Sequence, residues 1–362
     1  MKRNVLLTPG PLTTSRKTKE AMLQDVGTRD VDYQTMIQKL REKLLQLACG
    51  DPEQDSVIFM QGSGTFGVES VLGSALGEQD KVLILSNGAY GHRMATICNK
   101  AGIAYEEASF NMIEALKLEI IEPYIAKSDI THVAYIHCET TAGILNPIEE
   151  IQALIHQYHK ISIVDAMSSF GSMPMDITAL GIDYMITSSN KCLHGVPGVA
   201  IIFAKKAQLD TCANHSKSLA LDLYEQYRYM EEYSGSFRFT SPTHVLLALD
   251  HAVDELIEAG GIVKRNERYN KIQKTIRDAM KKAGFQTLVS DQIQSPVITT
   301  FLYPEKFCFP EFYDFFKEHG FLLYSGKLPD YDAFRIGNIG DIRDEDVTHF
   351  LDVLKQWEER NL

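Results

Sequence analysis

The segments Ile161-Ser-Ile-Val-Asp165 and Tyr184-Met-Ile-Thr-Ser-Ser-Asn-Lys191 show the pattern that decides the fold of this 362-residue chain. Each segment begins as a short apolar run and ends in polar residues. Short apolar runs that are separated by helices are typical of parallel strands with helices on both faces of the sheet. The sequence therefore predicts an α/β fold with a mostly parallel central sheet.

The same alternation extends in both directions from these segments. Further strands are predicted at residues 56–60, 81–85, 132–136 and 198–203, with helices at 65–76, 91–101 and 148–159. After residue 242 the pattern changes to helices at 243–260, 262–283, 311–319 and 344–360, with strands at 297–301 and 334–336. Length alone suggests about two domains. We expect a large domain over residues 15–245 and a smaller C-terminal α+β domain over 246–362.

Composition excludes several classes of protein. The formal net charge of −12 and the absence of long Lys/Arg runs argue against binding to nucleic acid or to an anionic membrane surface. The six cysteines show neither a CxxC pair nor a metal-ligand spacing, which predicts no metal site and a reducing, cytoplasmic location. The apolar run Val5-Leu6-Leu7 ends before Pro9 and is too short for a signal peptide, and no segment is long enough to span a membrane.

Polar and small residues follow five of the predicted strands, at positions 61–65, 86–93, 137–143, 165–171 and 188–195. Ligands of open α/β sheets bind beyond the carboxyl ends of the strands. We therefore expect these five strand ends to form one ligand-binding cleft.

Three features of that cleft suggest its chemistry. Gly62-Ser63-Gly64-Thr65 opens a helix, which suits a phosphate, although an ordinary glycine-rich turn with a capping hydroxyl explains it equally well. Asp165 is either a helix cap or a charge partner. Lys191 lies among small residues at a strand end, where a partly desolvated lysine can form a Schiff base with a carbonyl. Together these features match the needs of pyridoxal 5′-phosphate, with Tyr90 available to stack on its ring.

These residues, together with Leu7-Thr-Pro-Gly-Pro11, Gly88-Ala-Tyr-Gly91, Phe239-Thr-Ser-Pro242 and Phe334-Arg335-Ile-Gly337, resemble the class V, fold type I aminotransferases that depend on pyridoxal phosphate. The resemblance covers essentially the whole chain. It is strongest to members that transfer the amino group of 2-aminoethylphosphonate to pyruvate, a reaction of phosphonate degradation that gives phosphonoacetaldehyde and L-alanine. It also implies a homodimer with a shared active site, which residues 1–14 help to line.

The resemblance assigns a role to each residue of the cofactor site. Lys191 is implied to hold the cofactor aldehyde as an imine and then to act as general acid and base. Asp165 is implied to pair with the pyridinium nitrogen, while Tyr90 stacks on the ring. The remaining cofactor contacts that it implies are Ser63, Gly64 and Thr65 at the phosphate, Thr240 reaching that phosphate from the neighbouring subunit, and Thr141 and Asn190 near the ring substituents.

The substrate site is less fully assigned. Arg335 is implied to bind the carboxylate of pyruvate or alanine through two hydrogen bonds. Arg29 and Arg93 are candidates for the anionic group of the amino donor, but ordinary salt bridges explain them about as well. For His92, His137 and His194 we expect hydrogen-bonding or packing roles, since a Schiff-base lysine removes the need for a histidine base.

Other functions stay open at this stage. The nearest alternative is another class V enzyme, such as an aminotransferase of the alanine–glyoxylate or serine–pyruvate type. A cysteine desulfurase needs an exposed, mobile thiol, and Cys192 directly after Lys191 is poorly placed for that role. Outside this chemistry, the alternative is a non-catalytic nucleotide-binding relative that keeps only the sheet.

Overall fold

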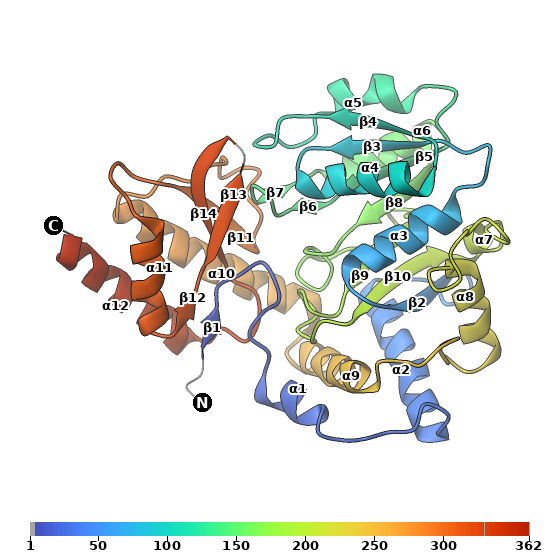
Figure 1. The fold of residues 1–362 in the computed structure, drawn as a ribbon, viewed down its shortest axis with the longest axis horizontal. Helices are drawn as coiled ribbons and strands as arrows, with labels where there is room; N and C mark the ends of the chain where they lie inside the picture. The colour runs from blue at the N-terminus through green and yellow to red at the C-terminus, as the bar shows by residue number, and fades with distance from the viewer. Residues whose placement is uncertain (1–3, 329, 362) are drawn as a thin grey trace.

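The computed structural model describes residues 4–328 and 330–361, and its centre is a seven-stranded sheet (Figure 1). Six strands run in one direction, and β10 is antiparallel to both of its neighbours. The strand order is β2 (Asp55–Gln61), β10 (Val199–Lys205), β9 (Tyr184–Ser188), β8 (Ile161–Asp165), β5 (His132–Ile136), β3 (Val82–Ser86) and β4 (Tyr105–Ser109).

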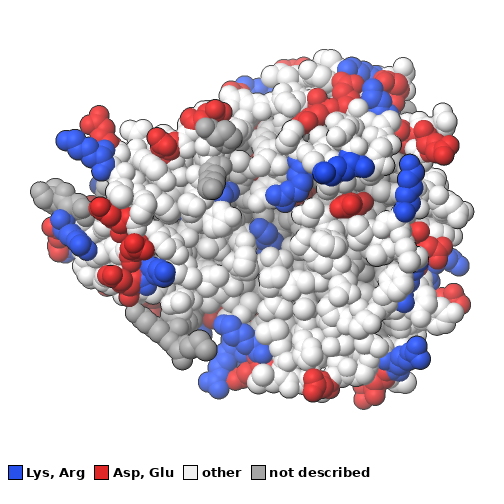
Figure 2. Space-filling view, in the orientation of Figure 1, with Lys and Arg blue, Asp and Glu red and all other residues white. Residues whose placement is uncertain are grey.

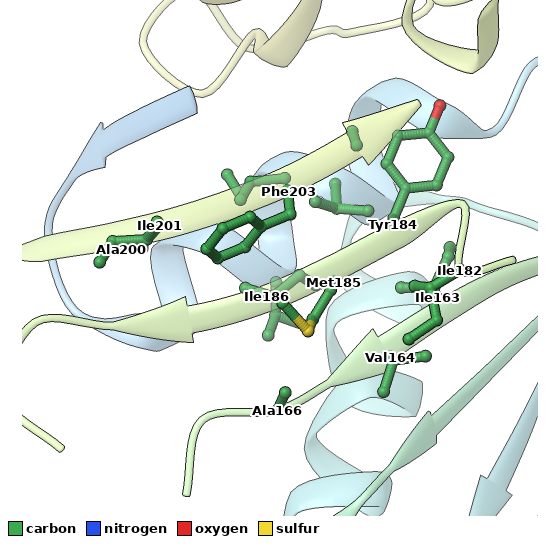
Figure 3. Close-up of a cluster of buried hydrophobic side chains, with 14 of the residues drawn as sticks. Ile163, Val164, Ala166, Ile182, Tyr184, Met185, Ile186, Ala200, Ile201 and Phe203 are labelled. Atoms are coloured by element: carbon green, nitrogen blue, oxygen red, sulfur yellow. The ribbon is translucent and has the colours of Figure 1, made fainter. Parts of the chain in front are cut away.

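Helices cover both faces of this sheet, with α3 and α4 in front and α6 behind in the view of Figure 1. Burial on both faces explains why the strands are almost continuously apolar. In β8 and β9, for example, Val164 and Met185 are fully buried side by side (Figure 3). The helices around the sheet are α1 (Arg16–Ala21), α2 (Val31–Leu47), α3 (Gly64–Ala75), α4 (Ala89–Ala101), α5 (Leu118–Ile125), α6 (Ile148–Gln157), α7 (Lys206–Leu209), α8 (Leu223–Glu232) and α9 (Thr243–Glu258).

A second hydrophobic core lies in the C-terminal part of the chain and is rich in phenylalanine, with Phe301, Phe312 and Phe334 fully buried. It packs around an antiparallel sheet of order β11-β14-β13. The elements are α10 (Gly261–Lys282), β11 (Ile298–Leu302), α11 (Phe309–Glu318), β13 (Tyr324–Leu328), β14 (Tyr331–Gly337) and α12 (Asp344–Asn361). The amino-terminal strand β1 (Val5–Leu6) belongs here as well, because it pairs in parallel with β12 (Phe321–Leu322).

Every strand and helix predicted from the sequence is present. Their ends agree within two residues, except that β14 begins at Tyr331 rather than Phe334. The pattern did not predict the antiparallel direction of β10. It also did not predict the helices α1, α2, α5, α7 and α8, the strands β4 and β13, or the two-residue strands β1, β6, β7 and β12. The domain boundary after residue 245 stays a proposal. Because α9 contributes Leu246 and Leu256 to the core of the large sheet, its packing favours a boundary further along the chain, within α10.

The surface agrees with an acidic chain that carries both signs of charge. On the face in Figure 2, basic and acidic side chains are interspersed rather than gathered into one basic surface. Among residues 4–328 and 330–361, no helix combines the length and apolar character needed to cross a membrane.

Candidate active site

The five strand ends meet, as the sequence predicted, around one cavity of about 200 Å³. Parallel strands bring their carboxyl ends to one edge, and the antiparallel β10 does not disturb this because its partners β2 and β9 keep the common direction. The polar and aromatic residues that line the cavity are Ser63, Thr65, Tyr90, Arg93, Thr140, Asp165, Ser168, Ser188, Asn190 and Lys191, with Gly64, Cys138 and Met167 between them.

Lys191 lies in the turn after β9, under the amino-terminal segment of the chain. Its Nζ donates a hydrogen bond of 2.5 Å to the carbonyl oxygen of Pro9. A Cβ atom on Gly10 would lie only 2.7 Å from Lys191 Cδ, so this segment fits closely over the lysine because residue 10 has no side chain. Burial lowers the pKa of Lys191. A lowered pKa increases the fraction of neutral amine, which is the form that attacks a carbonyl.

Asp165 ends β8 and is 6% exposed at the cavity wall. Its Oδ1 accepts a hydrogen bond of 2.8 Å from the Met167 amide, so it closes a local turn and does not cap an α-helix. Burial raises the pKa of Asp165 to about 7. The hydrogen bond from the Met167 amide and the positive charges of Lys191 and Arg93 act in the opposite direction and lower this pKa. A buried carboxyl group in this state gains most from a cationic partner, such as a protonated ring nitrogen.

The amino end of α3 provides a place for an anion. Ser63 is the N-cap residue, and its side chain makes no capping hydrogen bond. Gly64 lets the backbone approach the cavity closely, because a Cβ atom there would lie 2.5 Å from Met167 Sδ. Arg93 adds a positive charge on this side, since its Nη1 lies 3.4 Å from Thr65 Oγ1 and its guanidinium lies over the Tyr90 ring. Free amides at a helix start beside an arginine suit a phosphate group.

Arg335 approaches the site from β14 and is 9% exposed. Its Nη1 donates a hydrogen bond of 2.7 Å to the carbonyl oxygen of Thr140, and the Tyr324 ring lies 4.8 Å from its Cζ. Within the described part of the chain, its buried Nε has no hydrogen-bond partner. A buried guanidinium with unused donors is a ready binding group for a carboxylate.

Four of the predicted site residues do not line this cavity. Arg335 and Thr141 lie beside it, next to the lining residue Thr140, whereas the other two are elsewhere. Arg29 and Thr240 line a separate hollow of about 520 Å³ with Tyr33 and Phe239, and in a single chain they do not join Lys191. Of the two arginines proposed for the amino donor, only Arg93 lines the cavity itself.

Thr141 is also placed differently from the expectation. Its Oγ1 donates to Glu139 Oε1 at 2.6 Å and accepts from the Ala89 amide at 3.1 Å, so its hydroxyl is engaged away from the cavity. The neighbouring Thr140 lines the cavity instead. The sequence could not distinguish two adjacent threonines, because the turn that orients them depends on the pairing of β6 (Cys138–Glu139) with β7 (Ile144–Leu145).

None of the three histidines singled out in the sequence lines the cavity. His92 is exposed and faces Glu107, and burial lowers the pKa of His137 to about 4. His194 is buried against the Tyr269 hydroxyl, which fits the expected packing role. Cys192 is fully buried, and burial raises the pKa of its thiol to about 11, which does not suit a mobile nucleophile.

Sequence reasoning missed Glu139. The residue is fully buried, and a carboxylate in the run His137-Cys-Glu-Thr140 directly after a strand was the available signal.

A family model described as Aminotransferase class-V matches residues 14–327. The chain is 48% identical over 358 residues to a 2-aminoethylphosphonate–pyruvate transaminase of Phocaeicola vulgatus, which covers 98% of this chain and 99% of that protein. It is 47% identical over 356 residues to a bifunctional phosphonoacetaldehyde hydrolase/aminoethylphosphonate transaminase of Clostridioides difficile, and there it spans only 56% of the longer relative.

The fold is shared more widely. The crystal structure of ureidoglycine–glyoxylate aminotransferase from Bacillus subtilis superposes with a TM-score of 0.91 at 24% sequence identity, over 99% of this chain and 94% of that one. At this level of identity the likeness establishes the fold and not the substrate.

Proposed function

The chain belongs to the class V aminotransferases, and from that premise we propose that it transfers the amino group of 2-aminoethylphosphonate to pyruvate, giving phosphonoacetaldehyde and L-alanine. The observation that carries this proposal is the identity of 47–49% over nearly the whole chain to transaminases of that name. The hydrolase activity in the name of the bifunctional relative is not part of this proposal.

Pyridoxal phosphate is the cofactor of this chemistry, and the residues of the cavity fit it. Lys191 has a lowered pKa and lies under Pro9, Asp165 offers a buried carboxyl to a ring nitrogen, and the start of α3 offers free amides to a phosphate. When bound, the cofactor supplies an aldehyde for covalent attachment and a ring that accepts electrons. We propose Lys191 as the amine that holds it, Asp165 as the partner of its ring nitrogen and Tyr90 as the ring that stacks on it.

The proton transfers are assigned to Lys191. As a free amine, its Nζ would take the proton from the substrate carbon that bears the amino group and would deliver it to a different atom, so that the amino group can leave that carbon. The Pro9 carbonyl accepts a hydrogen bond from this nitrogen at 2.5 Å and therefore fixes the position of the free amine. Pro9 thus orients the group that moves the proton.

Arg335 is proposed to bind the carboxylate of pyruvate. Its Nη1 is used by the Thr140 carbonyl, so the edge formed by Nε and Nη2 is left for two parallel hydrogen bonds to the substrate. Because the Thr140 carbonyl holds Nη1, the Nε–Nη2 edge has a fixed direction. A carboxylate bound to that edge would orient the substrate carbonyl carbon toward Lys191.

A homodimer explains why Arg29 and Thr240 lie apart from the cavity of their own chain. Both line the surface hollow that also contains Phe239, a residue with 51% of its surface exposed. In the proposed dimer Thr240 reaches the phosphate of the neighbouring site, and Arg29 becomes available to the phosphonate there. Arg93 is the candidate from the same chain, although its position next to Thr65 favours the cofactor phosphate. A cytoplasmic location stays a prediction from the sequence.

The decisive experiment measures pyruvate-dependent consumption of 2-aminoethylphosphonate by the purified protein. Serine and alanine, each with glyoxylate, and taurine with pyruvate serve as competing pairs. The proposal predicts that the first pair is turned over fastest, and faster turnover of serine or alanine with glyoxylate would overturn it. Borohydride treatment is expected to fix the cofactor to the peptide that contains Lys191, and Lys191→Ala is the control that loses this product.

A further inference from the structure

Glu139 is a fully buried carboxylate next to the active site, and none of the roles above uses it. Its Oε1 accepts two hydrogen bonds from Thr141, at 2.9 Å from the amide and 2.6 Å from the hydroxyl. Its Oε2 is buried without a hydrogen-bond partner within the described chain. A buried carboxylate oxygen left in this state costs free energy, so its presence calls for a physical reason.

The unpartnered oxygen faces the first turn of α4. A Cβ atom on Gly88, the N-cap residue, would lie 2.4 Å from Glu139 Cδ and 2.7 Å from Oε2, so the carboxylate packs directly against this end of the helix. Burial raises the pKa of Glu139, while the amides of Tyr90 and Gly91 lower it, although neither forms a hydrogen bond of good geometry with Oε2. Burial thus favours the protonated form of Glu139, and the amino end of the helix favours the charged form.

The same residue controls the turn that holds Arg335. Glu139 fixes Thr141 through its side chain, and its own carbonyl accepts the Gly143 amide at 3.0 Å. Between them, Thr140 presents its carbonyl oxygen to Arg335 Nη1. Burial lowers the pKa of Arg335, and Glu139 acts in the opposite direction together with Tyr90 and Tyr324. The Glu139 side chain therefore contacts two structural supports: the first turn of α4, which carries the cavity residue Tyr90, and the turn that holds Arg335 beside the cavity.

We propose that Glu139 is a positioning residue that joins the first turn of α4 to the 139–141 turn and thereby fixes Tyr90 against the cofactor and Arg335 against the substrate carboxylate. This inference rests on the proposed function for its substrate part, whereas its cofactor part needs only that pyridoxal phosphate binds. Glu139 is not a catalytic residue in this account, because it does not reach the reacting atoms.

The test compares Glu139→Gln with Asp183→Asn. Both replace a buried carboxylate by its amide, but Asp183 lies before β9, where it accepts from the Ser162 amide at 2.9 Å, far from the cavity lining. Three quantities are measured on each purified protein: the dissociation constant of pyridoxal phosphate from the substrate-free enzyme, the KM for pyruvate and the melting temperature.

For Glu139→Gln we expect about a tenfold weaker binding of pyridoxal phosphate and about a tenfold higher KM for pyruvate, because both supports are displaced. Asp183→Asn is expected to lower the melting temperature while leaving both constants near the wild-type values. Glu139→Asp, which keeps the charge, should recover part of both constants. If Glu139→Gln changes the melting temperature alone, the residue is merely structural and the inference is wrong.

Gly88→Ala provides a second route if Glu139→Gln fails to fold. Gly88 has an extended backbone that any residue adopts, so the added methyl group acts only by pushing the Glu139 carboxylate. The same weakening of cofactor and pyruvate binding is expected, and unchanged constants would count against the inference. If the wild-type protein binds pyridoxal phosphate but does not transaminate with pyruvate, the proposed function fails while the cofactor measurement still decides the role of Glu139.

Discussion

Replacing Arg335 tests the substrate clamp most directly. In the structure Nη1 is bonded to the Thr140 carbonyl, and within residues 4–328 and 330–361 the buried Nε has no hydrogen-bond partner. We therefore expect the Nε–Nη2 edge to form two hydrogen bonds with a carboxylate. Arg335→Gln removes the charge and leaves at most one of these bonds. A hydrogen bond to a charged group is worth about 1.5–3 kcal/mol. Because about 1.4 kcal/mol corresponds to a factor of ten, kcat/KM for pyruvate is expected to fall by about 10- to 150-fold.

Arg335→Lys separates charge from geometry. Lysine keeps the positive charge but presents a single ammonium group, which cannot hold both the Thr140 carbonyl and the two oxygens of a carboxylate. Its loss in kcat/KM is therefore expected near the lower end of that range. Arg335 is only 9% exposed, so solvent screens the interaction weakly and the larger values apply to the glutamine variant.

The assay is the initial rate of alanine formation at saturating 2-aminoethylphosphonate over a series of pyruvate concentrations. The dissociation constant of pyridoxal phosphate is measured in parallel and should stay unchanged, because the predicted cofactor contacts do not include Arg335. Arg343→Lys is the matched control, since Arg343 is an exposed arginine that pairs with Asp341. The reasoning is refuted if both Arg335 variants keep kcat/KM for pyruvate within about threefold of the wild type.

Burial raises the pKa of Asp165 to about 7, so between about pH 4 and pH 7 the folded cofactor-free protein retains a proton that the unfolded chain has released. Its stability should therefore fall as pH rises through this window, and Asp165→Asn should flatten that slope in thermal unfolding. Gly10→Ala should cost about 1–3 kcal/mol in denaturant unfolding, since φ is +116° and the new Cβ would lie 2.7 Å from Lys191 Cδ; an unchanged midpoint would contradict this. Mixing Lys191→Ala with Thr240→Ala subunits should restore one intact site per mixed dimer, and no gain in cofactor binding would argue against a shared site.

The sequence predicted the sheet and the clustering of polar residues well because both depend on local patterns. An apolar run and the polar residues directly after it can both be recognised from neighbouring positions in the sequence. In a parallel sheet the carboxyl ends of the strands lie at one edge, so the residues that follow the strands lie close together. Lys191 and Asp165 were therefore found together without any long-range information. Strand β4 was missed for the same physical reason, since its residues Tyr105 to Ser109 are mostly half-buried at the sheet edge and carry no apolar run.

The errors concern contacts that a local pattern does not determine. Whether Thr140 or Thr141 faces the cavity depends on the hairpin of β6 and β7 and on the packing of Glu139 against Gly88. Glu139 itself looked like an ordinary polar loop residue, because burial of a carboxylate next to a helix start is decided by the tertiary fold. Within a single chain, Arg29 and Thr240 do not reach the cavity that contains Lys191. Their proposed contacts require the second subunit of the proposed dimer.

The main chain of the amino-terminal segment links Arg335, the proposed carboxylate-binding residue, to Lys191, the proposed amine. The Gly337 amide, two residues after Arg335, donates to the Leu7 carbonyl at 3.0 Å, and a Cβ atom on Gly337 would lie 2.4 Å from the Thr8 carbonyl oxygen. Two residues after Leu7, the Pro9 carbonyl accepts the hydrogen bond from Lys191 Nζ. The distance between the proposed carboxylate clamp and the amine is therefore set by backbone hydrogen bonds and close backbone packing rather than by flexible side chains alone. An acidic chain can bind anionic substrates in this way because the few positive groups it needs are held at fixed separations inside one cleft.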